Sequence, residues 1–183
     1  MKVVILAGGR GTRLSEYTNL IPKPMVKVKN SPIIIHIMNH YARYGFKDFI
    51  IATGYKNQVI KKFFKRKISD WNVKIVNTGI NTMTGGRLKR LKKFIENQTF
   101  MLTYGDGLCD VNIKKLNEFH IKNQSIATLT AVRPPARFGA IKIRGSKVTY
   151  FKEKSFLDEG WINGGFFVFD AKIFKFLKND KTY

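Results

Sequence analysis

Short apolar runs alternate along this chain with segments whose apolar residues recur at helical spacing. The run over residues 3–6 is too short and too continuous to be anything but a buried strand. The strands that we expect cover residues 3–6, 49–53, 73–76, 100–104, 126–132 and 166–169. The alternation is typical of βαβ units, so the sequence predicts an α/β fold around a mostly parallel sheet.

Three segments between these runs are predicted to begin or end at recognisable helix signals. The first helix should start at Ser31–Pro32 and end at Gly45. Residues 88–95 predict one basic amphipathic helix, and Asp110 is expected to cap a third. Beyond Arg133 the pattern changes to short strands over 140–143 and 148–151, as in many substrate-binding additions.

Length and composition are those of a protein with one hydrophobic core. With 183 residues, 44% of them hydrophobic, the chain can bury roughly two thirds of its unfolded surface. We find neither an internal repeat nor a composition shift that would mark a linker. A single domain over residues 1–183 is therefore expected.

The charge balance indicates anionic partners. The 34 Lys and Arg residues exceed the 12 Asp and Glu residues, for a formal net charge of +22, which would attract nucleotides, sugar phosphates or nucleic acid. Lys, Ile, Asn and Phe are all plentiful, however, so a broad compositional bias accounts for the excess equally well. A basic nucleic-acid-binding module is favoured by charge alone, without an aromatic platform or a readout helix to support it.

Cysteine content and hydropathy indicate a cytoplasmic protein. Cys109 is the single cysteine, which excludes an intrachain disulfide. The apolar start runs directly into Gly8, unlike a signal peptide, and no run approaches the roughly 20 apolar residues of a membrane helix.

The most informative motif follows the first strand and reads Leu6-Ala7-Gly8-Gly9-Arg10-Gly11-Thr12-Arg13-Leu14. A strand that ends in glycines exposes backbone N–H groups in a concave nest, where phosphate oxygens can approach closely. Arg13 adds a guanidinium fork suited to phosphate. The pattern is neither G-x-G-x-x-G nor G-x-x-x-x-G-K-S/T, which disfavours a Rossmann dinucleotide site and a P-loop. A tight strand-to-helix turn is the alternative interpretation.

A second motif, Pro22-Lys23-Pro24-Met25, places a lysine between two prolines that stiffen the backbone. Lys23 can therefore meet a phosphate as a fixed point charge, although alone the motif is only a stiff loop. Together, the glycine loop and Pro-Lys-Pro resemble the opening signature of the sugar nucleotidyltransferases.

Later motifs resemble one branch of that family, the glucose-1-phosphate cytidylyltransferases. The matching stretches are Thr78-Gly79, Thr82 to Arg90, Tyr104-Gly105-Asp106-Gly107, Arg137-Phe138-Gly139-Ala140, Glu153-Lys154 and Ile162 to Phe167. The resemblance implies a Rossmann-like, three-layer αβα fold, that of the nucleotide-diphospho-sugar transferases. The sequence departs from the family in a shorter stretch at 65–71 and in stopping at Tyr183, before a closing region with a second metal-binding aspartate.

The resemblance also implies a role for each site residue. Arg13 and Lys23 would stabilise phosphate charge, and Asp106 would bind Mg²⁺ as the cofactor. The implied nucleotide-binding residues are Leu6, Ala7, Gly8, Gly9, Arg10, Gly11, Thr12, Thr82, Arg87 and Gly105, and the implied sugar-phosphate-binding residues are Gly139, Glu153, Lys154 and Asn163. Without the resemblance, Asp106 would be interpreted as a turn residue and Glu153–Lys154 as a charged strand edge.

The implied reaction joins CTP and glucose 1-phosphate into CDP-glucose and pyrophosphate, in a homo-oligomer that binds neither nucleic acid nor membrane. A uridylyl- or thymidylyltransferase is the nearest alternative, because base choice depends on residues 82–90 alone. A non-catalytic nucleotide-binding relative is another. Since only Asp106 of the two implied metal ligands is present, we expect the chain to bind CTP and to turn over poorly unless more sequence follows Tyr183.

Overall fold

The computed structural model describes residues 1–11, 20–66, 68–95, 97–134, 140–152 and 160–183, without the side chains of Ala140 and Lys152. The chain forms two compact units. The first consists of Met1–Thr128 with Gly165–Tyr183, and the second of Leu129–Gly164. The expectation of a single domain over 1–183 stays a prediction.

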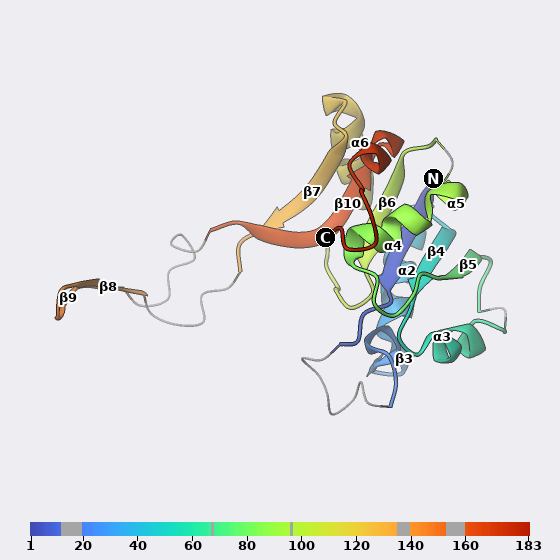
Figure 1. Cartoon of the computed structure of the whole chain (residues 1–183), viewed down its shortest axis with the longest axis horizontal. Coiled ribbons are helices and arrows are strands. Elements are labelled where there is room, and N and C mark those ends of the chain that lie inside the picture. Colours follow the sequence, from blue (N-terminus) through green and yellow to red (C-terminus); the bar gives the residue numbers. More distant parts are fainter. Residues whose placement is uncertain (12–19, 67, 96, 135–139, 153–159) are drawn as a thin grey trace. The chain divides into compact units, whose positions relative to one another are not determined.

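A mostly parallel sheet has the strand order β5-β4-β1-β6-β10-β7 (Figure 1), of which β5, β4, β1 and β6 lie entirely in the first unit. Strand β1 pairs in parallel with β4 and β6, and β4 pairs in parallel with β5. Strand β10 runs antiparallel to β6, which makes the sheet mixed. In sheet order the strands are β5 (Asn72–Asn77), β4 (Asp48–Thr53), β1 (Lys2–Ala7), β6 (Phe100–Tyr104), β10 (Ile162–Phe169) and β7 (Ala127–Val132).

Alternate residues of the strands face two separate hydrophobic clusters. Val3 and Ile5 pack in a cluster with residues of α2 (Ile33–Ala42), α3 (Asn57–Phe63) and α6 (Ile113–Asn123). Val4 packs in the other cluster, with residues of α4 (Thr84–Arg90), α5 (Lys92–Ile95) and the 3-10 helix η3 (Ala171–Lys175). Helical segments therefore cover both faces, and the three-layer αβα expectation is confirmed.

This double coverage explains why the central strand β1 is continuously apolar in sequence. Val3, Val4 and Ile5 are all completely buried, although successive side chains of a strand point to opposite faces. Each such side chain contributes about 1.5–3 kcal/mol relative to an exposed one.

Short elements precede α2 and form part of the second unit. The 3-10 helix η2 (Lys23–Met25) precedes a small hairpin of β2 (Lys27–Val28) and β3 (Ser31–Pro32). In the second unit, β8 (Ala140–Arg144) and β9 (Lys147–Lys152) form an antiparallel hairpin. Among the described helices, none has both the length and the apolar composition that a membrane crossing requires.

Three helix boundaries differ from the sequence prediction. Helix α2 begins one residue after Pro32 and ends at Ala42, and Gly45, with φ +86°, forms the turn beyond it. The single helix predicted over 88–95 is two helices, because Leu91 N–H donates to the Leu88 carbonyl and tightens the turn between them. Asn112, and not Asp110, caps α6, since its side chain accepts from the Lys115 N–H at 3.0 Å.

The three histidines all make contacts within the protein. His36 Nε2 lies 3.0 Å from the Val28 carbonyl oxygen, and His40 Nε2 lies 2.8 Å from that of Val111. His120 is buried in α6, with Nδ1 2.8 Å from Thr128 Oγ1. Burial lowers the pKa of His120 below its usual value of 6.5, although the charge of Asp170 opposes this effect.

A histidine whose pKa is lowered by folding destabilises the native state in acid. Below about pH 6.5 the unfolded chain binds a proton that folded His120 resists, so the free energy of unfolding should fall by up to about 1.4 kcal/mol per pH unit from this residue. We expect His120→Asn, which can keep the contact with Thr128, to lose less stability than the wild type between about pH 7 and about pH 5.5 in urea titrations. Identical pH slopes for the two proteins would contradict the assignment.

Candidate active site

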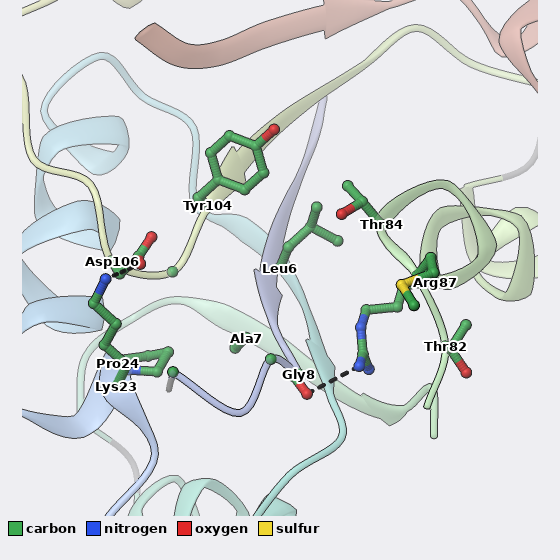
Figure 2. A pocket seen from close by; sticks show the side chains of 14 residues that line it. Leu6, Ala7, Gly8, Lys23, Pro24, Thr82, Thr84, Arg87, Tyr104 and Asp106 are labelled. Atoms are coloured by element: carbon green, nitrogen blue, oxygen red, sulfur yellow. Dashed lines mark hydrogen bonds and ion pairs between the residues drawn. The ribbon is translucent and has the colours of Figure 1, made fainter. Parts of the chain in front are cut away.

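A pocket of about 360 Å³ lies at the carboxyl ends of β1 and β6 (Figure 2). Open α/β sheets bind ligands at this edge, where the loops after neighbouring parallel strands meet. The pocket is lined by Leu6, Ala7, Gly8, Gly9, Gly11, Lys23, Pro24, Thr82, Met83, Thr84, Arg87, Tyr104, Gly105 and Asp106.

The glycine loop lies close against the side chain of Arg87, whereas the sequence predicted only a close approach of phosphate oxygens. A Cβ atom on Gly8 would lie 2.1 Å from a guanidinium nitrogen of Arg87, so a larger residue there would displace the Arg87 side chain. Gly11 has φ +66°, a conformation that favours glycine. The loop conformation therefore depends on contacts within the protein as well as on any ligand.

Arg87 joins the ends of three strands. Its guanidinium donates to the carbonyl oxygen of Gly8, at 2.9 Å, and to that of Gly79, at 2.6 Å. Further acceptors are Thr78 Oγ1 and the carbonyl oxygens of Ile80 and Thr53. The residue is 5% exposed. Burial lowers the pKa of Arg87, and the positive charge of Arg90 lowers it further. Arg87 thus holds the loop after β1 against the loops after β4 and β5.

Lys23 and Asp106 form an ion pair on another wall of the pocket. Lys23 Nζ lies 2.5 Å from Asp106 Oδ2, and the dashed line between them in Figure 2 marks the contact. Lys23 lies in η2 between Pro22 and the buried Pro24, and Asp106 follows Gly105 at the end of β6. Both side chains are partly exposed, 26% and 36%, so a ligand in the pocket can reach them.

The chemistry at Asp106 fits a cation bound together with a phosphate. Its carboxylate already attracts one positive group, the Lys23 ammonium. No group of three or more His, Cys, Asp or Glu side chains is placed to hold a metal in the part of the chain that the structure describes. Mg²⁺ commonly binds one or two carboxylates and completes its shell with phosphate and water, so Asp106 could bind it together with a phosphate.

The pocket brings together ten of the residues predicted from the sequence: Leu6, Ala7, Gly8, Gly9, Gly11, Lys23, Thr82, Arg87, Gly105 and Asp106. Arg10 is exposed outside this lining and donates to Asn81 Oδ1 at 3.2 Å. Thr12, Arg13, Gly139, Glu153 and Lys154 lie outside the described residues. Asn163 belongs to the second unit.

Four lining residues were not predicted as site residues, namely Pro24, Met83, Thr84 and Tyr104. All four lie within a quoted motif, and all but Thr84 directly adjoin a predicted residue. Pro24 follows Lys23, and Tyr104 precedes Gly105. Their position within these motifs was therefore the signal in the sequence that could have identified them as site residues.

The protein has an α/β nucleotidyltransferase fold. This class is defined by the sheet, by its coverage with helices on both faces and by the pocket at its carboxyl edge. The chain belongs to the nucleotidyl transferase family, whose model matches residues 2–183.

Relatives agree with this assignment over nearly the whole chain. The chain is 45% identical to a glucose-1-phosphate cytidylyltransferase of Salmonella typhimurium, in an alignment covering 100% of this chain and 80% of the relative. A probable glucose-1-phosphate cytidylyltransferase of Bacillus subtilis is 38% identical, with 98% and 79% covered. Among solved structures, HddC from Yersinia pseudotuberculosis complexed with GMP-PN has a TM-score of 0.75 and 30% identity, covering 99% of this chain and 81% of HddC.

The contacts of Arg87 predict a large loss of stability when its guanidinium is removed. Arg87→Met leaves buried carbonyl oxygens without their donor, so the free energy of unfolding should fall by about 3 kcal/mol or more in urea titrations. Arg87→Lys should recover little of this loss, because an ammonium lacks the planar fork. Arg144→Met, at an exposed position of β8, is the control and should stay within about 0.5 kcal/mol of the wild type. Equal losses at the two positions would refute the role of Arg87.

Proposed function

We propose that this chain transfers a cytidylyl group from CTP to glucose 1-phosphate, giving CDP-glucose and pyrophosphate. The observation that carries the proposal is the pocket in which the glycine loop, Lys23 and Asp106 meet, in a chain 45% identical to a glucose-1-phosphate cytidylyltransferase. The product would serve nucleotide-sugar and surface polysaccharide synthesis, including O-antigen and lipopolysaccharide. We place the protein in the cytoplasm, as a homo-oligomer.

The reaction requires fixed positive charge more than acid or base chemistry. A sugar phosphate, with a second pKa near 6, is already an anionic nucleophile at pH 7. One of its oxygens forms a bond to the α-phosphorus of CTP, while the bond from that phosphorus to the bridging oxygen of the β-phosphate breaks. Pyrophosphate leaves with the electron pair, so no proton transfer is needed. What opposes the step is repulsion between two anions and poor in-line alignment.

We assign Lys23 and Asp106 to reducing this repulsion between the two anions. Lys23, held between two prolines, would contact the phosphates of the nucleotide as a preorganised cation. Asp106 would hold Mg²⁺, which supplies further positive charge at the phosphates when bound. Lys23 and Asp106 form an ion pair at 2.5 Å. On binding, the phosphate would become the partner of Lys23 and the metal would become the partner of Asp106. Arg13 is assigned to the α-phosphate.

The remaining roles follow the family resemblance. Glu153, Lys154, Gly139 and Asn163 are proposed to bind the sugar phosphate, with Lys154 on the phosphate and Glu153 on sugar hydroxyls. Leu6 to Thr12, Gly105, Thr82 and Arg87 are proposed to form the nucleotide side. For Arg87 the contacts with Gly8 and Gly79 favour an indirect contribution, through the position of the loop.

A second candidate is the same reaction with another nucleotide. Uridylyl and thymidylyl transfer need the same glycine loop and Asp106. Guanylyl transfer is favoured by the similarity to HddC, which was solved in complex with GMP-PN. The base-side wall, Thr82 to Arg87, would have to discriminate among these bases.

The experiment that tests the proposal is pyrophosphate release with glucose 1-phosphate and each nucleoside triphosphate in turn. We expect CTP to be preferred over UTP, by roughly 10⁴ where the hydrogen bond to the base is fully buried, because the N4 amino group of cytosine needs an acceptor where uracil presents O4. Equal rates with CTP and UTP would remove the cytidylyl assignment and leave the class intact.

Lys23 should matter far more than the surface lysines. Lys23→Ala is expected to lower turnover by on the order of 10² or more, the effect of losing one preorganised donor at developing charge, and Arg13→Ala should act similarly. Lys62→Ala removes the same charge from an exposed position of α3 and should change turnover little. Comparable losses at Lys23 and Lys62 in steady-state assays would favour diffuse electrostatics over a fixed site.

A further inference from the structure

A segment far from the pocket in sequence supports its base-side wall. Residues 178–182 follow η3 and lie against the start of α4. The Met83 N–H donates to the Asp180 carbonyl oxygen at 2.8 Å, and the Gly86 N–H donates to that of Thr182 at 3.1 Å. The first N–H groups of a helix have no acceptor within the helix, so this segment supplies acceptors that α4 lacks.

Side chains add a charged connection to the same contact. Arg90 Nε and Nη2 donate to the two carboxylate oxygens of Asp180, at 2.9 and 2.5 Å. Arg90 Nη1 also donates to the Thr78 carbonyl oxygen at 3.0 Å. The hydrogen bonds from Arg90 hold the pKa of Asp180 below its usual range, and the same contact raises the pKa of Arg90. One guanidinium therefore joins α4, the segment 178–182 and the loop after β5.

Glycine at position 86 permits this close approach. A Cβ atom there would lie 2.5 Å from the Asp180 carbonyl oxygen and 2.6 Å from the Asp180 Cα, so any side chain would displace the segment. The Gly-Gly pair of α4 thus has a packing role between two parts of the chain.

The supported turn is also a wall of the pocket. Thr82, Met83, Thr84 and Arg87 all line the pocket, and the Arg87 N–H donates to the Met83 carbonyl oxygen at 2.8 Å. A shift of Met83 away from Asp180 would therefore move the lining residues and the helix turn that carries the Arg87 guanidinium.

We propose that Asp180 is a positioning residue for nucleotide binding, acting through Arg90 and the first turn of α4 on residues 82–87. The proposal rests on the proposed function, since it concerns the nucleotide side of that pocket. Loss of the contact should weaken nucleotide binding more than the chemical step, because the phosphate-facing Lys23 and Asp106 lie on another wall. We expect the Kd and KM for CTP to rise roughly tenfold, with a smaller change in kcat at saturating CTP and none in the KM for glucose 1-phosphate.

The test compares Asp180→Ala with Asp70→Ala. Asp70 is a matched control, because it is also an exposed carboxylate in an ion pair, with Lys47 at 2.6 Å, and does not line the pocket. Amide hydrogen exchange at Met83 and Gly86 reports the contact directly, and calorimetry gives the Kd of each nucleoside triphosphate. In Asp180→Ala we expect faster exchange at both amides and weaker CTP binding, in Asp180→Asn a smaller effect, and in Asp70→Ala neither effect.

Three results would overturn the proposal: wild-type exchange at Met83 and Gly86 in Asp180→Ala, faster exchange with unchanged nucleotide affinity, or equal losses of affinity in the Asp180 and Asp70 variants. The exchange measurement needs no nucleotide. A wild-type chain that bound none of the nucleoside triphosphates would count against the proposed function, independently of the contact.

Discussion

The burial of one guanidinium constrains the whole site. A charged group removed from water is costly unless hydrogen bonds satisfy it, and Arg87 finds its acceptors at the carboxyl ends of β1, β4 and β5. The three strands must therefore keep the parallel register that brings Gly8, Thr53 and Thr78 to one edge of the sheet. These hydrogen bonds constrain both partners. The strands fix the position of the Arg87 side chain, and Arg87 in turn fixes the loop that follows β1.

That constraint distinguishes the site from the general basicity of the chain. A net charge of +22 attracts anions to the whole surface, but exposed charges are screened over roughly 8–10 Å at ordinary ionic strength. Transfer between two anions depends instead on cations that are already in place when charge develops. Lys23, fixed by its flanking prolines, meets that requirement, whereas an exposed lysine such as Lys62 does not.

Sequence reasoning predicted the parts of the molecule that local pattern determines. The strand at residues 3–6 was identifiable because a buried parallel strand must be apolar on both faces. Lys23 was identifiable because two prolines flank it, whereas Asp106 was assigned only through the family resemblance. The cap of α6 was misplaced because Asp110 and Asn112 are equally good caps, and only the hydrogen bond to the Lys115 N–H distinguishes them. The break at Leu91 likewise involves packing, since Leu88 of α4, Leu91 itself and Ile95 of α5 all enter one hydrophobic cluster.

The contacts that shape the pocket escaped prediction for another reason, which is their separation along the chain. Gly8 meets Arg87, and Met83 meets Asp180, through hydrogen bonds to backbone carbonyl groups, which every residue carries and which leave no trace in periodicity. The glycines at 8 and 86 were the only visible sign, and each was ambiguous, because a glycine that admits a phosphate and a glycine that admits another segment look alike in sequence. Glycine-rich motifs around such a pocket therefore carry two kinds of information, the approach of the ligand and the packing of the protein that holds it, and only the fold separates them.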